Sequence, residues 1–463
     1  MTTLTLTPEL RAAELRTRVA GTVVFPHEEG WDEARLAWNL HADQRPAAVV
    51  FAESAEDVAA VVAFARSRGY GVAPQGTGHF ATALRGLDDE TILLKTERMQ
   101  RVEVDAAGRR VRAEAGVIWQ QVIDAAAPHG LAALHGSAHD VGVVGYSLGG
   151  GIGWYARKHG MAANSVLAFE VVTADGRIVR TDAEHEPELF WALRGGGGSF
   201  GIVTAIELAL LPITEVYAGA LFWPMERAPE ILRAYTRWAD ALPDEVTSCG
   251  RLMQFPPIPD VPEHLRGRSF VLVEAVVLGD DAAGEAALAP LRALGPELDT
   301  AALVPASSIT TLHMDPPHPV PGVGDGTMLA ELTDETIDTL VAAAGSGSGS
   351  TLVSVELRQL GGALARPATG HGAIAALDAA YAMYAVGMAM SPPMAEASAA
   401  DVGRVLAALE PWESTRTYFN FTERTTEVED IHAPDTAARL RALKARLDPT
   451  ELFRVAHPVA PAQ

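Results

Sequence analysis

The chain has 463 residues, 48% of them hydrophobic, and a formal net charge of -23. The length predicts two domains, and the acidity excludes a nucleic-acid partner because phosphate binding relies on clustered Lys and Arg. The lone cysteine, Cys249, excludes an intrachain disulfide and a Cys-based metal site, and neither a signal-like N-terminus nor an eighteen-residue apolar run occurs, so we expect a cytoplasmic protein with no membrane partner.

Short apolar runs and helical spacing alternate in the first half of the chain. A strand at 47–51, a helix at 55–68 and a strand from 71 to 73 predict a β-α-β start. Further strands are predicted at 91–95, 101–104, 111–115, 166–173, 177–181 and 201–210, and helices at 117–128 and 187–193. Ala174-Asp175-Gly176 is a hairpin turn between two of these strands.

After Pro212 the composition changes and predicts a second α+β unit. Its strands are expected at 217–223, 270–277, 351–360, 382–389 and 416–421, and its helices at 228–241, 281–294 and 398–409. The alternating Gly and Ser residues at 345–350 predict a flexible surface loop. A last helix is predicted at 434–447.

Three glycine-dense stretches are the most informative feature of the sequence. They are Gln75-Gly76-Thr77-Gly78-His79, the run Gly142–Gly153 and the run Arg194–Gly201. Glycine is conformationally expensive, so such runs indicate backbone that turns sharply or closely approaches a large ligand. A phosphate-bearing cofactor is the natural candidate.

Simpler motifs within these stretches suggest other chemistry. Gly76–Ala81 matches a dinucleotide fingerprint, but the helix that must follow it is not predicted. Gly145–Gly149 matches the GxSxG motif of serine hydrolases, although three consecutive glycines are a poor start for the helix behind such a serine. His135 and His139 have an i,i+4 spacing without a helix to present it, so we expect no metal site.

The order of the longer motifs resembles a known family. QGTGH, GSAHDVGVVGYSLGGGIGWYARKHG, VLAFEVVTADGRIV, ELFWALRGGGGSFGIVTAIEL and RLRALKARLDPTELF follow one another as in the berberine-bridge-enzyme-like branch of the vanillyl-alcohol-oxidase (PCMH-type) flavoproteins. The resemblance is strongest over 45–212 and 412–454. It implies an α+β fold: an FAD-binding domain of two subdomains at 1–212 (core 45–212), a substrate domain with an antiparallel sheet covered by helices at 213–415, and a segment at 416–463 that returns to the FAD domain.

The resemblance also implies the cofactor site. The loop Gln75, Gly76, Thr77 and Gly78 would hold the FAD pyrophosphate through backbone N–H groups, and His79 would bond covalently to the flavin. The other residues expected at the cofactor are Ala138, His139, Val141, Gly142, Gly145, Gly149, Gly150, Gly151, Gly153, Gly201, Ile202, Val203 and Asn420. Ala138 stands where relatives carry a second, cysteinyl tether, so a double tether is excluded.

Departures from the family pattern concern charged residues. Gln75 replaces the usual Arg of the cofactor loop, and Arg358 stands where relatives often have Glu. Strand alternation puts Glu356 on the face of Arg358. Arg358 can therefore pair with Glu356, bind an acidic substrate group or lower the pKa of a nearby phenol. His313, Met314 and Trp223 are further candidates for the pocket, although packing explains each as readily.

The activity implied is that of an FAD-dependent oxidase acting on a small organic substrate such as an alcohol, a sugar or a natural-product intermediate. Tyr418 would accept a substrate proton, with Tyr146 as a second candidate and Arg358 as a catalytic neighbour. Dioxygen would be the second substrate, and Val141 resembles the oxygen-access residue of oxygen-reactive members. A dehydrogenase with another electron acceptor and a serine hydrolase remain alternatives, and neither the substrate nor the oligomeric state follows from the sequence.

Overall fold

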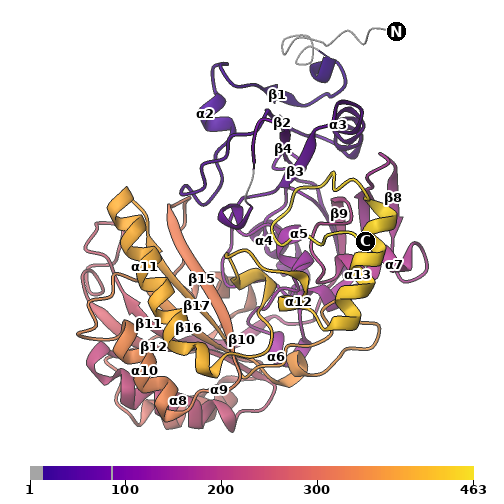
Figure 1. Cartoon of the computed structure of the whole chain (residues 1–463). Helices are drawn as coiled ribbons and strands as arrows, with labels where there is room; N and C mark the ends of the chain where they lie inside the picture. Colours follow the sequence, from indigo (N-terminus) through magenta and orange to yellow (C-terminus); the bar gives the residue numbers. More distant parts are fainter. Residues whose placement is uncertain (1–13, 85–86, 463) are drawn as a thin grey trace, which may run out of the picture.

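The computed structural model describes residues 14–84 and 87–462, which form three β-sheets and the helices that cover them (Figure 1). The two smaller sheets come from the first half of the chain, and the largest comes from the second half. This arrangement agrees with the expected α+β fold class.

The first sheet has the order β1-β2-β4-β3, with β2 and β3 both parallel to β4. Its strands are β1 (Thr22–Val24), β2 (Ala48–Phe51), β3 (Gly71–Gln75) and β4 (Thr91–Lys95). Helix α3 (Ala55–Arg68) starts where Ser54 accepts the Asp57 N–H and ends at Gly69, whose φ is 78°. A short helix, α2 (Trp31–Ala34), precedes β2.

The second sheet is antiparallel, with the order β5-β6-β9-β7-β8. Its strands are β5 (Val102–Asp105), β6 (Arg110–Glu114), β7 (Val166–Val172), β8 (Ile178–Thr181) and β9 (Ile202–Ala209). The helices of this part are α4 (Trp119–Ala126), α5 (Val143–Leu148), α6 (Ala156–His159) and α7 (Pro187–Leu193). The first glycine-dense stretch follows β3, the second begins just before α5 and continues beyond it, and the third follows α7. All three therefore lie at the ends of these elements.

The third sheet has the order β13-β10-β12-β11-β16-β17-β15, with β14 also paired to β10. Its strands are β10 (Glu215–Pro224), β11 (Val246–Gln254), β12 (Ser269–Val277), β13 (Leu298–Asp299), β14 (Ala302–Pro305), β15 (Gly322–Leu329), β16 (Ser354–Gln359) and β17 (Tyr381–Met388). Helices α8 (Ala228–Asp240), α9 (Asp281–Arg292), α10 (Asp334–Ala344) and α11 (Pro392–Leu409) lie on the side away from the first half of the chain (Figure 1).

Strand alternation divides the side chains of this third sheet between two environments. Val271 and Val273 of β12, and Val355 and Leu357 of β16, belong to the apolar core under the helices. Their neighbours Glu274 and Glu356 are buried on the opposite face, which we call the inner face. The inner face therefore carries charge, and the outer face carries the hydrophobic core.

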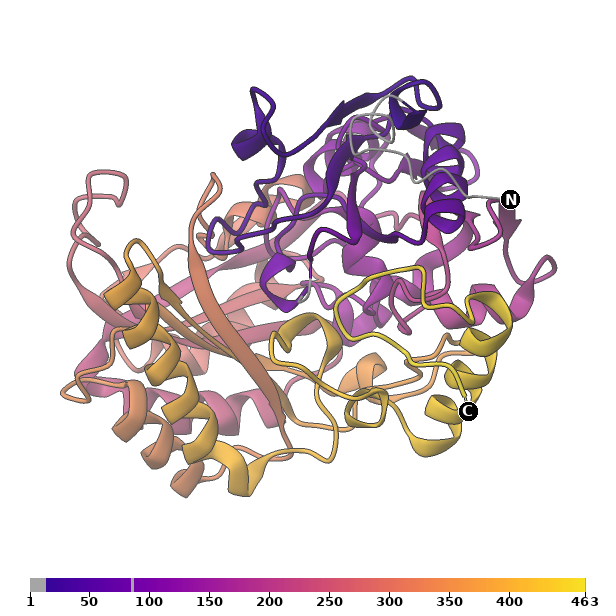
Figure 2. The ribbon, with the colours of Figure 1, turned by 45° about the horizontal axis from the view of Figure 1, so that its top comes forward.

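The end of the chain returns to the first half, beside which α13 lies in both views (Figure 2). Helices α12 (Val428–Ile431) and α13 (Pro434–Leu447) precede a segment that runs along β3, where Val72 and Phe453 form a parallel bridge. At the end of α13, Lys444 Nζ donates to Asp448 at 2.6 Å and to the Ser199 carbonyl at 2.8 Å. These contacts support our proposed segment at 416–463, and the boundaries at 212 and 415 stay predictions.

Most predicted elements occur within a few residues of their expected ends, but the strand at 416–421 is wrong. Phe419–Phe421 form one turn of 3-10 helix, because the Thr422 hydroxyl donates to the Tyr418 carbonyl and the Asn420 amide donates to the Tyr146 carbonyl. The sequence analysis did not predict β11, β15 or α10. The interpretation of Trp223 as a candidate pocket residue is also wrong, since Trp223 is fully buried in the core under the helices.

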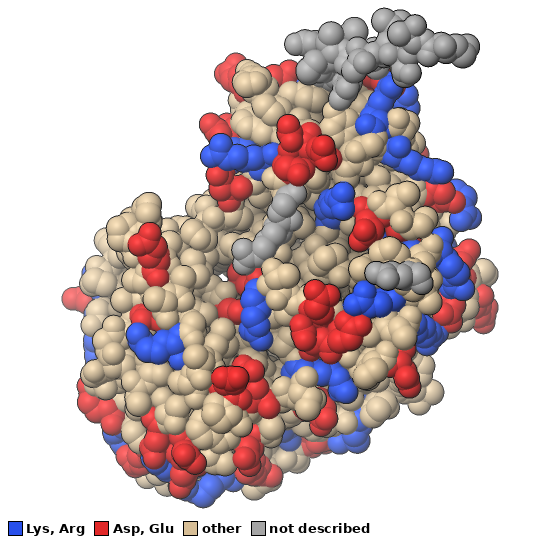
Figure 3. All heavy atoms as spheres, viewed as in Figure 1, with Lys and Arg blue, Asp and Glu red and all other residues tan. Residues whose placement is uncertain are grey.

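Acidic and basic side chains are interspersed on the face shown in Figure 3. Among the described residues, no helix combines the length and the apolar character needed to cross a membrane.

We predict that Asp448→Ala destabilises the protein by about 3–5 kcal/mol, because it leaves the buried Lys444 charge unpaired. The same substitution removes the acceptor of the Leu452 and Phe453 N–H groups. Chemical denaturation measures the free energy of unfolding. Asp435→Ala, at an exposed position in the first turn of the same helix, is the matched control. Equal stabilities of the two variants would contradict the role of this pair.

Candidate active site

His79 lies in the loop after β3, against residues from two other segments. Its ring stacks on Trp38 with centroids 4.1 Å apart and planes 17° apart. Nδ1 lies 2.7 Å from the Thr77 hydroxyl, and Nε2 lies 3.3 Å from an Asp140 oxygen. Trp38 Nε1 donates to the other Asp140 oxygen at 2.5 Å. The imidazole is thus held by a ring, a hydroxyl and a carboxylate.

Two backbone segments beside His79 present N–H groups without partners. Within the described residues, the N–H groups of 76–80 and of 138–140 donate to no acceptor. Gly78 has a φ of 83°, and a Cβ there would lie 2.8 Å from the Ala37 Cβ, so only glycine fits. Consecutive free N–H groups in such a loop form a concave anion site. Gln75 adds a buried Oε1 without a partner among the described residues.

The run after α5 is a glycine cradle, by which we mean Gly149, Gly150, Gly151 and Gly153. Gly150 and Gly151 have φ values of 107° and 81°. A Cβ at Gly149 would lie 1.8 Å from the Asn420 Oδ1, and one at Gly153 would lie 1.8 Å from the His135 carbonyl oxygen. The cradle therefore brings the backbone against side chains from the C-terminal segment with no room for larger residues.

Tyr418 is the phenol that this cradle holds. Its oxygen accepts the Gly151 N–H at 2.9 Å and the Asn420 amide at 3.3 Å, and its ring is buried. Burial raises the pKa of Tyr418 above its usual value near 10, although the Gly151 N–H and the Arg358 charge oppose the shift. Both contacts donate to the oxygen, which is the arrangement that stabilises a phenolate.

Tyr146 lies against the cradle as a packing residue. Its ring would contact a Cβ at Gly136 or at Gly151, and its hydroxyl is buried without a partner among the described residues. Burial raises the pKa of Tyr146 well above its usual value, and no described residue donates to its oxygen, whereas two donate to the oxygen of Tyr418. Both tyrosines were predicted from the sequence, and their contacts favour Tyr418.

Arg358 projects from β16 on the inner face and joins the sheet to the cofactor side. It donates to Glu356 through Nε at 3.1 Å and through Nη2 at 3.2 Å, and Nη2 also donates to the Ser137 hydroxyl at 2.9 Å. Its guanidinium carbon lies 5.2 Å from the Phe421 ring centroid. The predicted pairing with Glu356 is present.

The remaining predicted cofactor residues occupy three places. Gly142 and Gly145 lie at the start of α5 and in it, and Ala138 and His139 belong to the segment with free N–H groups. Val141 is half-buried, and its carbonyl accepts the Trp119 N–H. Gly201, Ile202 and Val203 begin β9; Ile202 and Val203 are core residues, and a Cβ at Gly201 would lie 2.4 Å from the Val171 Cγ1. Packing alone accounts for this last group, and its place near the adenine stays a prediction.

The alternative motifs do not form the sites that they suggest. Ser147 of the GxSxG motif is fully buried, and its hydroxyl donates to the Val143 carbonyl at 2.8 Å, so it is not an exposed nucleophile. The fingerprint at Gly76–Ala81 is followed by a single 3-10 turn at Ala81–Ala83 rather than by a helix. Burial lowers the pKa of His135 to about 4, and the described residues contain no metal-binding cluster of His, Cys, Asp and Glu.

Trp38 and Glu274 were not predicted as residues of this site, because a lone aromatic or acidic residue far from the motifs carries no signal of its neighbours. Asp140 was expected near the cofactor, but without a contact to His79. Ser137 and Phe421 lie within the motifs and were given no role.

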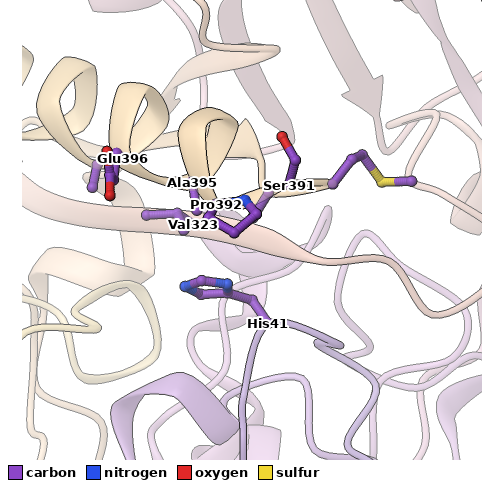
Figure 4. A pocket seen from close by; sticks show the side chains of 9 residues that line it. His41, Val323, Ser391, Pro392, Ala395 and Glu396 are labelled. Carbon is purple, nitrogen blue, oxygen red and sulfur yellow. The ribbon is translucent and has the colours of Figure 1, made fainter.

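An open hollow of about 570 Å3 lies near the site but outside it. His41, three residues after Trp38, points toward Val323 of β15 and the start of α11, where Ser391 and Pro392 lie (Figure 4). None of its lining residues belongs to the candidate active site.

Comparison with known proteins agrees with this geometry. Residues 46–182 match the family model described as FAD binding domain. The chain is 29% identical over 454 residues to (R)-6-hydroxynicotine oxidase of Paenarthrobacter nicotinovorans, covering 94% of this chain and 96% of the relative. It is also 35% identical over 239 residues to glucooligosaccharide oxidase of Sarocladium strictum, about half of each chain.

Solved structures extend the likeness to the whole fold. A crystal structure of 6-hydroxy-D-nicotine oxidase from Arthrobacter nicotinovorans has a TM-score of 0.81 at 25% identity, over 96% of this chain and 98% of that one. The BBE-like 1 protein of Physcomitrella patens has a TM-score of 0.84 at 20% identity, over 98% of this chain and all of that one. The chain contains an FAD binding domain at 46–182, and its relatives are FAD-linked oxidases. Its fold is that of the PCMH-type, berberine-bridge-enzyme-like flavoproteins.

The residues present in this chain fit FAD. Free N–H groups at 76–80 and 138–140 suit a pyrophosphate without a basic side chain, which agrees with the acidity of the chain. The glycine cradle provides the close backbone approach that a large flat ligand needs.

We predict that Gly151→Ala abolishes most FAD binding. The new Cβ would lie 2.4 Å from the Tyr146 ring at a φ of 81°, so the cradle must shift. The flavin content of the purified protein, from its visible absorbance, measures the effect. Gly403→Ala, in α11 with nothing within 4 Å of the added Cβ, is the control and is expected to keep its flavin. Full flavin content in Gly151→Ala would contradict the assignment of the cradle.

Proposed function

We propose that this protein is an oxidase that attaches FAD through His79 and oxidises a C–H bond of a small organic substrate, with dioxygen as the electron acceptor. Full-length similarity to (R)-6-hydroxynicotine oxidase and partial similarity to glucooligosaccharide oxidase support the reaction class. The substrate would be an alcohol, an amine, a sugar or a related natural-product intermediate. When bound, FAD would take a hydride from the substrate carbon and pass two electrons to dioxygen, giving hydrogen peroxide.

The observation that carries this proposal is the environment of the Tyr418 oxygen. Gly151 and Asn420 both donate to it, and no described residue accepts its proton. The phenol can therefore exchange its proton with a substrate hydroxyl or amine, and the two donors stabilise the phenolate that accepts it. Arg358 adds positive charge nearby.

His79 has the arrangement that a covalent link requires. With its Nε2 proton donated to Asp140, the imidazole keeps a lone pair on Nδ1, which the Thr77 hydroxyl meets in this structure. A lone pair held in place is the nucleophile that forms the bond to the cofactor. The absence of a cysteine at Ala138 leaves His79 as the one predicted tether.

We predict that FAD stays with wild-type protein after acid precipitation and is released or absent in His79→Ala, because the substitution removes the nucleophilic nitrogen. Visible absorbance of pellet and supernatant measures this. His41→Ala, outside the site, is the control and should behave as wild type. Flavin in the wild-type supernatant would refute the covalent link but leave the oxidase intact; a well-folded protein without flavin would refute both. Peroxide release under air identifies the first substrate and separates an oxidase from a dehydrogenase with another acceptor.

We predict that the rate at which that substrate reduces the flavin rises about tenfold per pH unit between pH 7 and 9, because a base with a pKa raised above 10 is mostly protonated there. Tyr418→Phe should lower the rate by about 10²–10⁴-fold and flatten the profile. Anaerobic stopped-flow absorbance measures both. Tyr146→Phe tests the other tyrosine and should keep the slope; a flat wild-type profile or a slope lost only in Tyr146→Phe would show that Tyr418 is not the base.

A further inference from the structure

Five charged side chains form a continuous chain on the inner face, which we call the charge chain: Arg251, Glu274, His313, Glu356 and Arg358. Arg251 of β11 lies directly opposite Glu356 of β16, and Cys249 lies between Glu274 and Arg358. His313 comes from the loop after 306–311 and bridges the two carboxylates. The exposed fraction of these five side chains does not exceed 12%.

His313 lies between two carboxylates at short distances. Nδ1 lies 2.7 Å from a Glu274 oxygen, and Nε2 lies 2.6 Å from a Glu356 oxygen, so each contact needs a proton between its two atoms. Burial and Arg251 lower the pKa of His313, but the carboxylates around it outweigh them and raise it. Burial alone would raise the pKa of Glu356, but Arg358 and His313 hold it below its usual value. The two carboxylate contacts and the raised pKa favour an imidazolium, and Arg358 Nη2 lies 3.2 Å from its Nε2.

With His313 protonated, the charge chain holds three positive and two negative charges, and Asp315 adds a negative charge that acts on Arg251, His313 and Arg358. Arg251 is satisfied by Glu274 at 3.0 Å, by the His313 carbonyl and by Ser354. Arg358 Nε and Nη2 have partners, but Nη1 donates to no described residue. The free donor nitrogen of the charge chain is thus at Arg358, beside the cofactor segment that contains Ser137.

Apart from Glu356, the nearby acids make no ion pair or hydrogen bond with Arg358 among the described residues. Asp325 accepts the N–H groups of Gly326 and Glu423 and pairs with Arg424 at 3.1 Å. Glu423 itself accepts the hydroxyls of Thr82 and Tyr384. Asp315 acts on Arg358 only through its field, without an ion pair or hydrogen bond among the described residues. A largely buried guanidinium with one free nitrogen can bind an anion from outside the chain.

We propose that Arg358 is an anion-binding subsite for the substrate, so that the substrate of this oxidase carries a carboxylate, and that His313 is a positioning residue that holds Glu356 and, through it, Arg358. This inference rests on the proposed function, because it places the subsite beside the cofactor and Tyr418. Phe421 lies against both Arg358 and Tyr418, so an aromatic or otherwise flat carboxylate fits the site best.

The experiment is a calorimetric titration of the purified holoenzyme with benzoate, phenylacetate and acetate, and with benzyl alcohol as a neutral probe. At least one carboxylate should bind wild type, and Arg358→Gln should weaken it by about tenfold or more. Arg424→Gln, which removes an arginine paired elsewhere, is the matched control and should bind as wild type. Circular dichroism and flavin content verify that each variant is folded.

His313→Gln tests whether His313 positions Glu356 and Arg358 in the folded protein. It also serves as the second variant if Arg358→Gln does not fold. Wild-type affinity for the carboxylate should fall as the pH rises through the raised pKa of His313, because the imidazolium that holds Glu356 is lost. In His313→Gln the affinity should be weaker and independent of pH between 6 and 9. The groups that face His313 are Glu274, Glu356, Arg251, Arg358 and Asp315, and Cys249 faces Arg358.

The experiment distinguishes failure of the proposed oxidase function from failure of the proposed anion-binding subsite at Arg358. A protein without flavin that binds the carboxylate through Arg358 would refute the oxidase and keep the subsite. A flavin-bearing protein that binds none of the three carboxylates, or binds them equally well in Arg358→Gln, would overturn the subsite and keep the oxidase. A neutral probe that loses affinity as strongly as the carboxylate in Arg358→Gln would also overturn it.

Discussion

Buried charge on the inner face of the third sheet is the constraint on which the rest of the substrate half depends. Glu274 and Glu356 have almost no exposure, and an unpaired carboxylate in such a place costs several kcal/mol. The partners are Arg251 of β11, His313 of the loop that precedes β15, and Arg358 of β16. Because every partner must be present at once, the charge chain fixes the register of β12, β11 and β16 against one another. Replacing a buried ion pair by apolar residues is often neutral or stabilising, so stability alone does not explain why the chain keeps five of these groups.

Three hydrogen bonds join the inner face and the segment around Tyr418 to the 136–153 region of the cofactor half. Arg358 reaches Ser137, Asn420 reaches the Tyr146 carbonyl, and Tyr418 receives the Gly151 N–H. All three contacts end on backbone or on small side chains of the 136–153 region. Glycine makes this possible, because a Cβ at Gly149 or Gly153 would occupy the positions of contacting atoms. Glycine-rich sequence and buried charge are thus two parts of one interface.

Local pattern was enough for most of the fold. β4 and α7 occur at the predicted residues, since an apolar TILLK run and a helix with Pro at its first turn are unambiguous. β15 was missed because GVGDGTML carries three glycines, and its stability comes from pairing with β17 rather than from strand propensity. The segment at Tyr418 reads as a strand in sequence, but its hydrogen bonds go to its own turn and to the glycine cradle.

The residues of the site likewise divide into those that a motif predicts and those that only the folded chain brings together. Motifs predicted His79, the glycines, Tyr418 and the pairing of Glu356 with Arg358 two residues away. Trp38 and Asp140 meet His79 from 41 and 61 residues away, and no periodicity predicts such contacts. The role of His313 depends on two distances to carboxylates on separate strands, which only the folded chain brings together.

The two chemical roles open to Arg358 compete with each other. A guanidinium that stabilises the Tyr418 phenolate must keep its charge available, whereas one that binds a carboxylate has that charge neutralised by the substrate. Arg358 makes no hydrogen bond to Tyr418, and the Phe421 ring contacts both residues. The phenol instead has two donors of its own, Gly151 and Asn420, which do not depend on Arg358. The geometry therefore separates the tasks: the cradle supports charge on Tyr418, and Arg358 is left with free donors for an anionic group of the substrate.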